Sequence, residues 1–446
     1  MSPPPDDADL LAIYEARGLV WHLLSSYKQA VADFEAMQQA AVRLGDRVKE
    51  GEALCNQAGA HWWLFAESYK GLVEKCAREA MAIAEETGDE RILARGLYSL
   101  AMVDQKAGAL KEADAKLLRS VEICRRRSLT GPLVTDLTWL GAHAGWRGEY
   151  GQSIVFTREA ARVAEASHEG FYELVALCVL CNAHAGLGEW DTAFQVLDDV
   201  RDKSQERENK YGIARGMNTA GWLHHQLGDL RQALELDRES LDFSKTAKLS
   251  NPEIYSIVNV AEDHLGLGEI GPARGILLDA AERLRTGSFD SHVWKWQMRV
   301  ALTFARLSLI ERDLERADTH LTEALTIAQR TGSQRHLAEG YRMRGELWLA
   351  AGRTQDGWAE LRRALDVAEA IGGPRTIWEN ASALGRALGP AREAEARDAY
   401  RRAVEALAVA LPRIPRPELR ESLLRSEPVA RLIEEAARLG VAPPPG

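Results

Sequence analysis

The chain lacks the features that mark several large classes of protein. It has only five cysteines in 446 residues, odd in number and scattered, so a disulfide framework is not expected. It has no uninterrupted apolar run of about 20 residues, the length that spans a membrane. Its first residues carry neither the basic region nor the apolar core of a signal peptide. We therefore expect a cytoplasmic protein in reducing surroundings, with no membrane partner.

Basic residues are also fewer than acidic ones, 56 against 66, and the formal net charge is −10. Because phosphate backbones are bound by basic faces, this balance argues against nucleic acid as the main ligand. The phosphate-binding loop G-x-x-x-x-G-K-[ST] does not occur. No nucleophile–base pair and no convergent metal set stands out. The sequence therefore predicts a non-catalytic protein with no cofactor and no metal site.

One segment could still be interpreted as part of a zinc site. Cys178, Cys181 and His184 follow one another at three-residue steps. Zinc needs a fourth ligand and donors that converge on one point, whereas residues at these steps drift around a helix. A structural role in helix packing is therefore favoured over zinc binding.

What the chain does contain is a small-residue signature that recurs every 40 residues. The step is marked by Gly108, Gly148, Gly188, Gly228 and Gly268. Small residues occur seven positions before each glycine and five after it, namely Ala101, Gly141, Cys181, Gly221 and Ala261, then Ala113, Ser153, Ala193, Ala233 and Ala273. A fixed step of this length indicates stacked copies of one supersecondary unit.

Each copy has the pattern of a helix, a tight turn and a second helix. In the clearest copy, Tyr211 to Lys248, helical periodicity covers residues 211–227 and the turn is Gly228-Asp229. Glycine tolerates the left-handed conformation that ends a helix, and Asp229 is expected to cap the next helix. The small residues would allow the two helices to approach closely. No strand-like alternation is sustained, so we predict an all-α protein.

The same pattern extends in both directions along the chain. Further turns are expected near Ser25, Glu67, Arg312, Gly352 and Gly389, with four residues inserted around 287–290 and a shortened last unit near 372–374.

These repeats predict a solenoid of about ten helix-turn-helix units over residues 8–411. A flexible N-terminus, residues 1–7, would precede it. Residues 412–446 would form capping helices, at 418–424 and 428–439, and a Pro-rich tail.

The turn glycine, its flanking small residues and the larger apolar residue two positions later resemble tetratricopeptide repeats, and this resemblance implies that the solenoid is a right-handed superhelix. The step of 40 in place of about 34 resembles the long-helix variety of bacterial maltose-activator-type regulators, and of the C-terminal halves of large ATPase and nucleotidyl-cyclase regulators. The tail LAVALPRIPRPELRESLL (407–424), followed by PVARLIEEA, is similar to the ending of such ATPase–repeat proteins.

Histidines also recur with the repeat, four positions before the turn glycine, at His184, His224 and His264. Tetratricopeptide repeats place a packing aromatic in that position, and an imidazole can fill it while making a hydrogen bond. Packing is therefore favoured over a proton relay or a metal array, since a residue that repeats with the fold usually serves the fold.

The resemblance implies that the first helix of each pair lines a concave groove. Positions counted back from each turn place there Arg95, Tyr98, Asn182, Arg215, Asn218, Trp222, His225, Tyr255, Glu262, Arg299, Arg306 and Arg342. Asn182 and Asn218 resemble the backbone-clamping asparagines of peptide-binding repeat proteins, and arginines bind carboxylates bidentately. Trp222 would be an aromatic anchor. The alternative is a solvated polar groove without a specific ligand.

Two functions follow from this pattern. The leading hypothesis is a non-catalytic scaffold that binds a peptide or a partner protein in the groove. The alternative is a sensory module that binds a small effector or signal peptide and controls a partner ATPase, cyclase or transcription factor. An enzyme would need a convergent catalytic site, which these helical positions do not supply.

Overall fold

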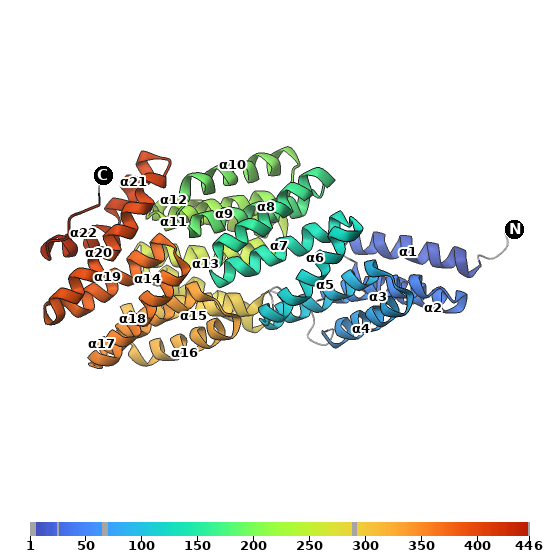
Figure 1. Ribbon diagram of the computed structural model, residues 1–446, viewed down its shortest axis with the longest axis horizontal. Coiled ribbons are helices and arrows are strands. Elements are labelled where there is room, and N and C mark those ends of the chain that lie inside the picture. Colours follow the sequence, from blue (N-terminus) through green and yellow to red (C-terminus); the bar gives the residue numbers. More distant parts are fainter. Residues whose placement is uncertain (1–5, 25, 65–69, 288–291, 445–446) are drawn as a thin grey trace. The chain divides into compact units, whose positions relative to one another are not determined.

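The structure, a computed structural model, describes residues 6–24, 26–64, 70–287 and 292–444. Within these residues every regular element is a helix, and the helices follow one another in pairs joined by tight turns (Figure 1). The predicted all-α repeat solenoid is confirmed. The turns expected at Ser25 and Glu67 lie outside the described residues. None of the described helices has both the length and the apolar character needed to cross a membrane.

The chain divides into two compact units, the first made of residues 1–140 and 166–169. The helices of this unit are α1 (Asp7–Leu23), α2 (Tyr27–Leu44), α3 (Arg47–Trp63), α4 (Lys70–Thr87), α5 (Glu90–Ala107), α6 (Leu110–Arg127) and the larger part of α7 (Thr130–Arg147).

The second unit comprises residues 141–165 and 170–446. Its helices are α8 (Tyr150–Ser167), α9 (Gly170–Gly186), α10 (Trp190–Glu206), α11 (Lys210–Gln226), α12 (Leu230–Ala247), α13 (Ser250–Gly266), α14 (Ile270–Arg285), α15 (Val293–Ile310), α16 (Leu314–Thr331), α17 (Gln334–Ala350), α18 (Thr354–Ile371), α19 (Pro374–Leu388), α20 (Glu393–Ala410), α21 (Pro417–Arg425) and α22 (Glu427–Arg438), with 3₁₀ turns η2 (Gly389–Arg392) and η3 (Leu411–Arg413). The two short helices predicted near the C-terminal end are thus present as α21 and α22.

Turns with a left-handed residue recur at the same step both within and between the helix pairs. The five turn glycines of the signature have φ between 70° and 83°. The turns between pairs place Gly88, Ser128, His168, Glu208 and Lys248, again 40 residues apart, at φ between 48° and 71°. The backbone N–H groups around most of these residues bond the last carbonyls of the preceding helix, as Gly228 does to His225 at 3.1 Å. This is the usual way to satisfy a helix C-terminus.

The small residues of the signature lie where paired helices touch. All ten are buried in the described structure. A Cβ atom added at Gly221 would lie 2.3 Å from Asp237 Oδ2, and one added at Gly141 would lie 2.3 Å from Thr157 Cγ2. Because real Cβ atoms do not approach so closely, these positions require glycine.

The acidic residue that follows the turn glycine bonds a histidine instead of capping a helix. Asp229 Oδ2 lies 3.0 Å from His224 Nδ1, and the Asp229 side chain makes no cap bond to α12. The prediction that Asp229 caps this helix is therefore wrong. The same contact joins His184 to Glu189 at 2.6 Å and His264 to Glu269 at 2.5 Å. His184, His224 and His264 thus each bond the acidic residue of the turn that follows them, which stabilises that turn.

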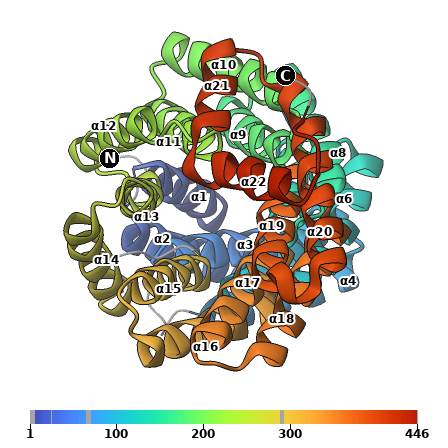
Figure 2. The ribbon, with the colours of Figure 1, turned by 90° about the vertical axis from the view of Figure 1, so that its left-hand side faces the viewer.

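The second unit winds far enough for distant repeats to meet. Figure 2 shows α9 to α20 following one another around a ring, with α22 inside it. Ser333 Oγ donates to the Trp146 carbonyl at 2.8 Å, and Arg375 Nη1 donates to the His225 carbonyl at 3.5 Å. A Cβ at Gly188 would lie 2.9 Å from Pro374. These contacts join residues 150 or more positions apart and fix the curvature of this unit.

The left-handed turns between pairs make a stability prediction. We expect Lys248→Gly to raise the free energy of unfolding by about 0.5–1 kcal/mol, because the left-handed conformation costs an ordinary residue about 1–2 kcal/mol and glycine loses less than that in entropy. Urea denaturation measures the change. Lys245→Gly, three residues earlier inside α12, is the matched control and should lose about 1 kcal/mol. Equal losses in both variants would contradict this account of the turn.

Candidate functional site

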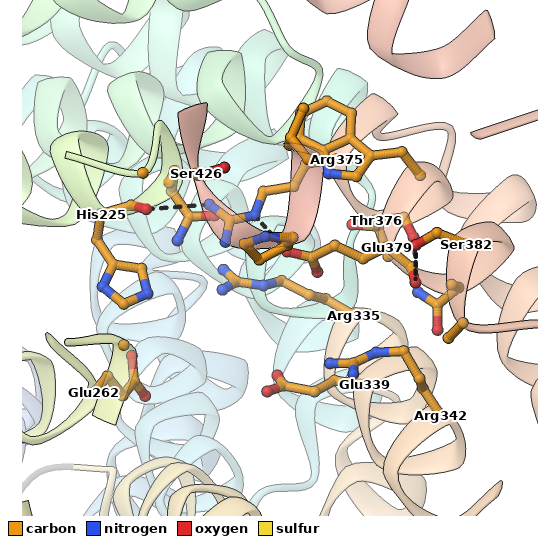
Figure 3. Close-up of a pocket in the computed structure, with 18 of the residues that line it drawn as sticks. His225, Glu262, Arg335, Glu339, Arg342, Arg375, Thr376, Glu379, Ser382 and Ser426 are labelled. Atoms are coloured by element: carbon orange, nitrogen blue, oxygen red, sulfur yellow. Dashed lines mark hydrogen bonds and ion pairs between the residues drawn. The ribbon is translucent and has the colours of Figure 1, made fainter. Parts of the chain in front are cut away.

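A cavity of about 500 Å³ lies inside the second unit, lined by residues of α8 to α22 (Figure 3). Its volume falls within the range of about 300–1,000 Å³ that is usual for ligand pockets. Trp222 and Tyr150 supply aromatic surface, and Thr376, Asn380 and Ser382 supply uncharged polar groups.

Charged side chains dominate the cavity lining. Seven arginines and five glutamates face it. Taking charges out of water is costly unless they are paired. Within the described part of the chain, five ion pairs join two lining residues, and besides Glu427–Arg431 at 3.8 Å there are four closer ones. These are Arg299–Glu262 at 2.8 Å, Arg306–Glu339 at 2.6 Å, Arg342–Glu346 at 3.2 Å and Arg375–Glu379 at 2.8 Å.

The surroundings set the ionisation of these groups. Burial works against ionisation of Glu339, but Arg306, His336 and Arg342 overcome it and hold the pKa of Glu339 at about 2. Burial, with help from Arg375, lowers the pKa of His225 to about 4. Burial likewise lowers the pKa of His336 to about 3. At neutral pH the cavity therefore presents ionised arginine–glutamate pairs and neutral imidazoles.

The C-terminal helix α22 completes one side of the lining. Ser426, Glu427 and Arg431 border the cavity. Glu435 of α22 binds Arg386 of α19 at 3.2 Å and Arg431 at 2.9 Å. This helix is therefore part of the wall of the cavity.

The sequence-predicted groove residues fall into three groups. Six of them line the cavity, namely Trp222, His225, Glu262, Arg299, Arg306 and Arg342. Arg95 and Tyr98 belong to the first unit, where Arg95 Nη2 donates to Asn56 Oδ1 at 2.6 Å. Asn182, Arg215, Asn218 and Tyr255 belong to the second unit but do not border the cavity.

Arg215 and Asn218 face a neighbouring helix instead of the groove expected for them. Arg215 is 6% exposed and Asn218 is 2% exposed. Arg215 Nη1 donates to Asn218 Oδ1 at 2.8 Å, and its guanidinium lies 3.6 Å from the centre of the Tyr255 ring. The Asn218 amide donates to Asp237 Oδ1 at 2.8 Å. In this structure both side chains hold α11, α12 and α13 together.

These buried groups continue as a network to the cavity. Asp237 Oδ1 also accepts from Asn259 Nδ2 at 3.1 Å, and Asn259 Oδ1 accepts from Arg299 at 2.8 Å. Arg299 then bonds Glu262 in the cavity wall. Burial raises the pKa of Asp237 well above its usual range, with a further contribution from nearby Asp263. A polar path thus connects the cavity to the helix-packing core.

A second buried polar contact joins His225, in the cavity lining, to Asp263 of α13. His225 Nδ1 is 2.6 Å from Asp263 Oδ1. Burial, and the neighbouring Glu262 carboxylate, raise the pKa of Asp263 to about 8. The raised pKa of Asp263 and the lowered pKa of His225 both favour an uncharged Asp263–His225 pair.

Several cavity residues were missed by sequence analysis. They are Tyr150, Arg335, His336, Glu339, Arg375, Glu379, Arg386 and those of α22. Glu339 had a usable signal, since it lies 13 residues before Gly352, as Arg299 lies 13 before Arg312. Arg335 lies 17 positions before Gly352, beyond the positions considered, and α22 lies outside the repeats.

Several solved structures align with this chain. A Rap protein complexed with Competence and Sporulation Factor aligns with a TM-score of 0.59 at 11% identity, over 81% of this chain and 98% of that chain. The apo form of RapI aligns with a TM-score of 0.45 at 10% identity, over 90% of this chain and 98% of that chain. The apo form of the quorum sensor NprR from B. thuringiensis aligns with a TM-score of 0.47 at 14% identity, over 78% of this chain and 98% of that chain.

No protein-family model and no curated protein matches the sequence. At 11% identity, the likeness to the Rap protein shows the fold, a tetratricopeptide-type helical repeat.

The burial of Arg215 predicts a structural effect for its removal. Arg215→Ala should lower the free energy of unfolding by about 2–4 kcal/mol, because it removes a buried hydrogen bond, a cation–π contact and the packing of a long side chain. Arg316, 74% exposed in its pair with Asp313, is the control. Arg316→Ala should change stability by less than about 0.5 kcal/mol. If urea unfolding shows that Arg215→Ala lowers the free energy of unfolding no more than Arg316→Ala does, the buried structural role of Arg215 is contradicted.

The Arg306–Glu339 pair makes a pH prediction. Glu339→Gln should lower the free energy of unfolding at pH 7 by about 1–3 kcal/mol, because the folded pKa of about 2 lies below the unfolded value near 4.3. This contribution is present above the unfolded pKa and is lost as pH falls towards the folded one. The difference in free energy of unfolding between Glu339→Gln and the wild type should therefore become smaller below about pH 4.5.

Urea unfolding at pH 7, 5 and 3.5 would follow this gap. Glu323→Gln, on the exposed surface of α16, is the control and should run parallel to the wild type. A constant gap for Glu339→Gln across the three pH values would contradict the stabilising ion pair.

Proposed function

We propose that the chain is a cytoplasmic sensory repeat protein that binds a short peptide in the second unit and thereby controls a partner protein. The observation that carries this proposal is the cavity of about 500 Å³, with its paired charges and the Trp222 side chain in its lining. A cavity of this volume, partly open to solvent, suits a short peptide better than a long segment of a partner protein. This favours the sensory hypothesis over a passive scaffold.

The chemistry of the lining suits a peptide. A peptide backbone both donates and accepts hydrogen bonds, and Thr376, Ser382 and Asn380 offer both kinds of group. Arg342 Nε and Asn380 Oδ1 have no hydrogen-bond partner among the described residues. A buried polar atom without a partner costs about 1–3 kcal/mol, so a ligand or water that reaches these atoms gains affinity. Arginine–glutamate pairs can bind charged side chains and termini by exchanging partners.

The comparisons and the sequence resemblance support a regulatory role. The Rap protein that shares this fold was crystallised with Competence and Sporulation Factor, and a corresponding ligand is proposed here for the cavity. The resemblance to maltose-activator-type and ATPase or cyclase regulators supplies the proposed output, which is control of a partner ATPase, cyclase or transcription factor. The network from Arg299 to Asp237 offers a route by which an occupied cavity would change helix packing.

A binding experiment tests the proposal. The purified chain should retain a short peptide from the low-molecular-mass extract of cells that express it, identified by mass spectrometry. Trp222→Ala should weaken binding of that peptide at least tenfold, because the ligand loses an aromatic contact worth about 1.4 kcal/mol or more. Phe171→Ala, an exposed aromatic outside the cavity lining, is the matched control and should bind normally.

Two outcomes would count against it. Retention of no peptide would contradict peptide sensing, and equal retention by the wild type and Trp222→Ala would contradict the site. Small-angle scattering with the identified peptide then separates sensor from scaffold. A sensor changes its scattering profile when the peptide binds, whereas a passive scaffold keeps the same profile.

A further inference from the structure

The charges of the cavity are balanced except at one arginine. Counting Glu435, which serves both Arg386 and Arg431, seven arginines meet six carboxylates. All five lining glutamates are in ion pairs, including Glu427 with Arg431 at 3.8 Å. Among the described residues, Arg335 is the lining arginine that has no carboxylate within ion-pair distance. One positive charge is therefore left for a ligand to neutralise.

Arg335 is also well placed to meet a ligand. Figure 3 shows its side chain extending from α17 across the cavity, towards His225 and Glu262 on the opposite wall. Its guanidinium carbon lies 5.5 Å from the centre of the Trp222 ring. The aromatic ring orients the guanidinium without consuming its N–H donors. Both side chains belong to the lining, so they present one combined surface to the cavity.

We propose that Arg335 is the anion-binding position of the cavity and that the peptide ligand carries a carboxylate that binds it. This rests on the proposed function, because it names the group by which the peptide is recognised. A carboxylate accepts two parallel N–H bonds from a guanidinium, which fixes both its position and its orientation. The carboxylate is either the C-terminus of the peptide or an aspartate or glutamate side chain.

The neighbouring charges make this position selective. Glu262, Glu339 and Glu379 lie in the same lining, and each is held by an arginine of its own. A cationic ligand group would have to displace one of those arginines. A neutral ligand would leave Arg335 with only the longer-range attraction of Glu339, Glu262 and Glu379, without a carboxylate within ion-pair distance. A carboxylate completes the last pair without breaking another.

Three peptide libraries test the assignment and identify the source of the carboxylate. All are N-acetylated random hexapeptides without lysine, arginine or histidine: one with free C-termini, one with amidated C-termini, and one amidated and also free of aspartate and glutamate. The full chain is incubated with each library, separated by gel filtration, and the bound peptides are quantified by mass spectrometry. We expect peptides with a carboxylate to bind at least tenfold more tightly than the neutral library. Amidation alone abolishes this preference if the C-terminus is the group recognised, and leaves it if a side chain is.

Variants of Arg335 locate the effect. Arg335→Gln should remove the tenfold preference for carboxylates while binding neutral peptides as the wild type does. Arg335→Lys should retain part of the preference, because it keeps the charge and loses the bidentate geometry. Arg316→Gln, on the exposed surface of α16, should behave as wild type. Thermal melts of all variants show that the fold is intact, and Arg335→Lys supplies the comparison if Arg335→Gln is unstable.

The outcomes separate this inference from the proposed function. Equal binding of neutral and carboxylate peptides by the wild type, or an undiminished preference in Arg335→Gln, overturns the Arg335 assignment and leaves peptide sensing in place. Retention of no peptide from any library overturns both.

Discussion

The close approach of two helices at small residues is the constraint on which the rest of the structure depends. Glycine, alanine, serine or cysteine must occupy two positions in every 40-residue unit, because larger side chains would push the paired helices apart. Each unit then turns the next by a similar amount, and the left-handed turns recur at the same spacing. In the second unit this repetition brings distant repeats into contact, as at Trp146 and Ser333. The cavity results from that accumulated curvature.

How much the sequence could predict follows from the same reasoning. The helices, their turns and the small contact positions depend on residues close together in the chain, and they could be read directly. Trp222, His225 and Glu262, which precede their turn glycines by six or three residues, line the cavity, although their predicted role in binding a partner stays a prediction. Arg335 and α22 were missed because their position depends on the summed rotation of many repeats, which no single repeat encodes.

The misplacement of Arg215 and Asn218 has a more local cause. Their positions, 13 and 10 residues before Gly228, lie at the border between the inner face and the face that meets the next pair. At this border the partner side chains decide the outcome. Asp237 is a buried carboxyl group that needs donors, and Asn218 and Asn259 supply them. Arg299, also 13 before its turn, bonds the same Asn259 yet reaches the cavity. Position alone therefore could not separate the two arginines.

That difference gives Arg299 a dual position in the molecule. One of its contacts is Glu262 in the cavity wall, and the other is Asn259, which bonds the buried Asp237. A hydrogen-bond network in a low-dielectric interior is sensitive to any change in a single member, because an unsatisfied buried group is costly. A ligand that draws Glu262 or Arg299 towards itself must alter the bonds to Asn259. Since Asn218 and Asn259 share Asp237 Oδ1, that change reaches the packing between α11, α12 and α13. In the proposed sensor, this continuous set of contacts from the cavity wall to the helix-packing core would be the route by which ligand binding changes the packing between repeats.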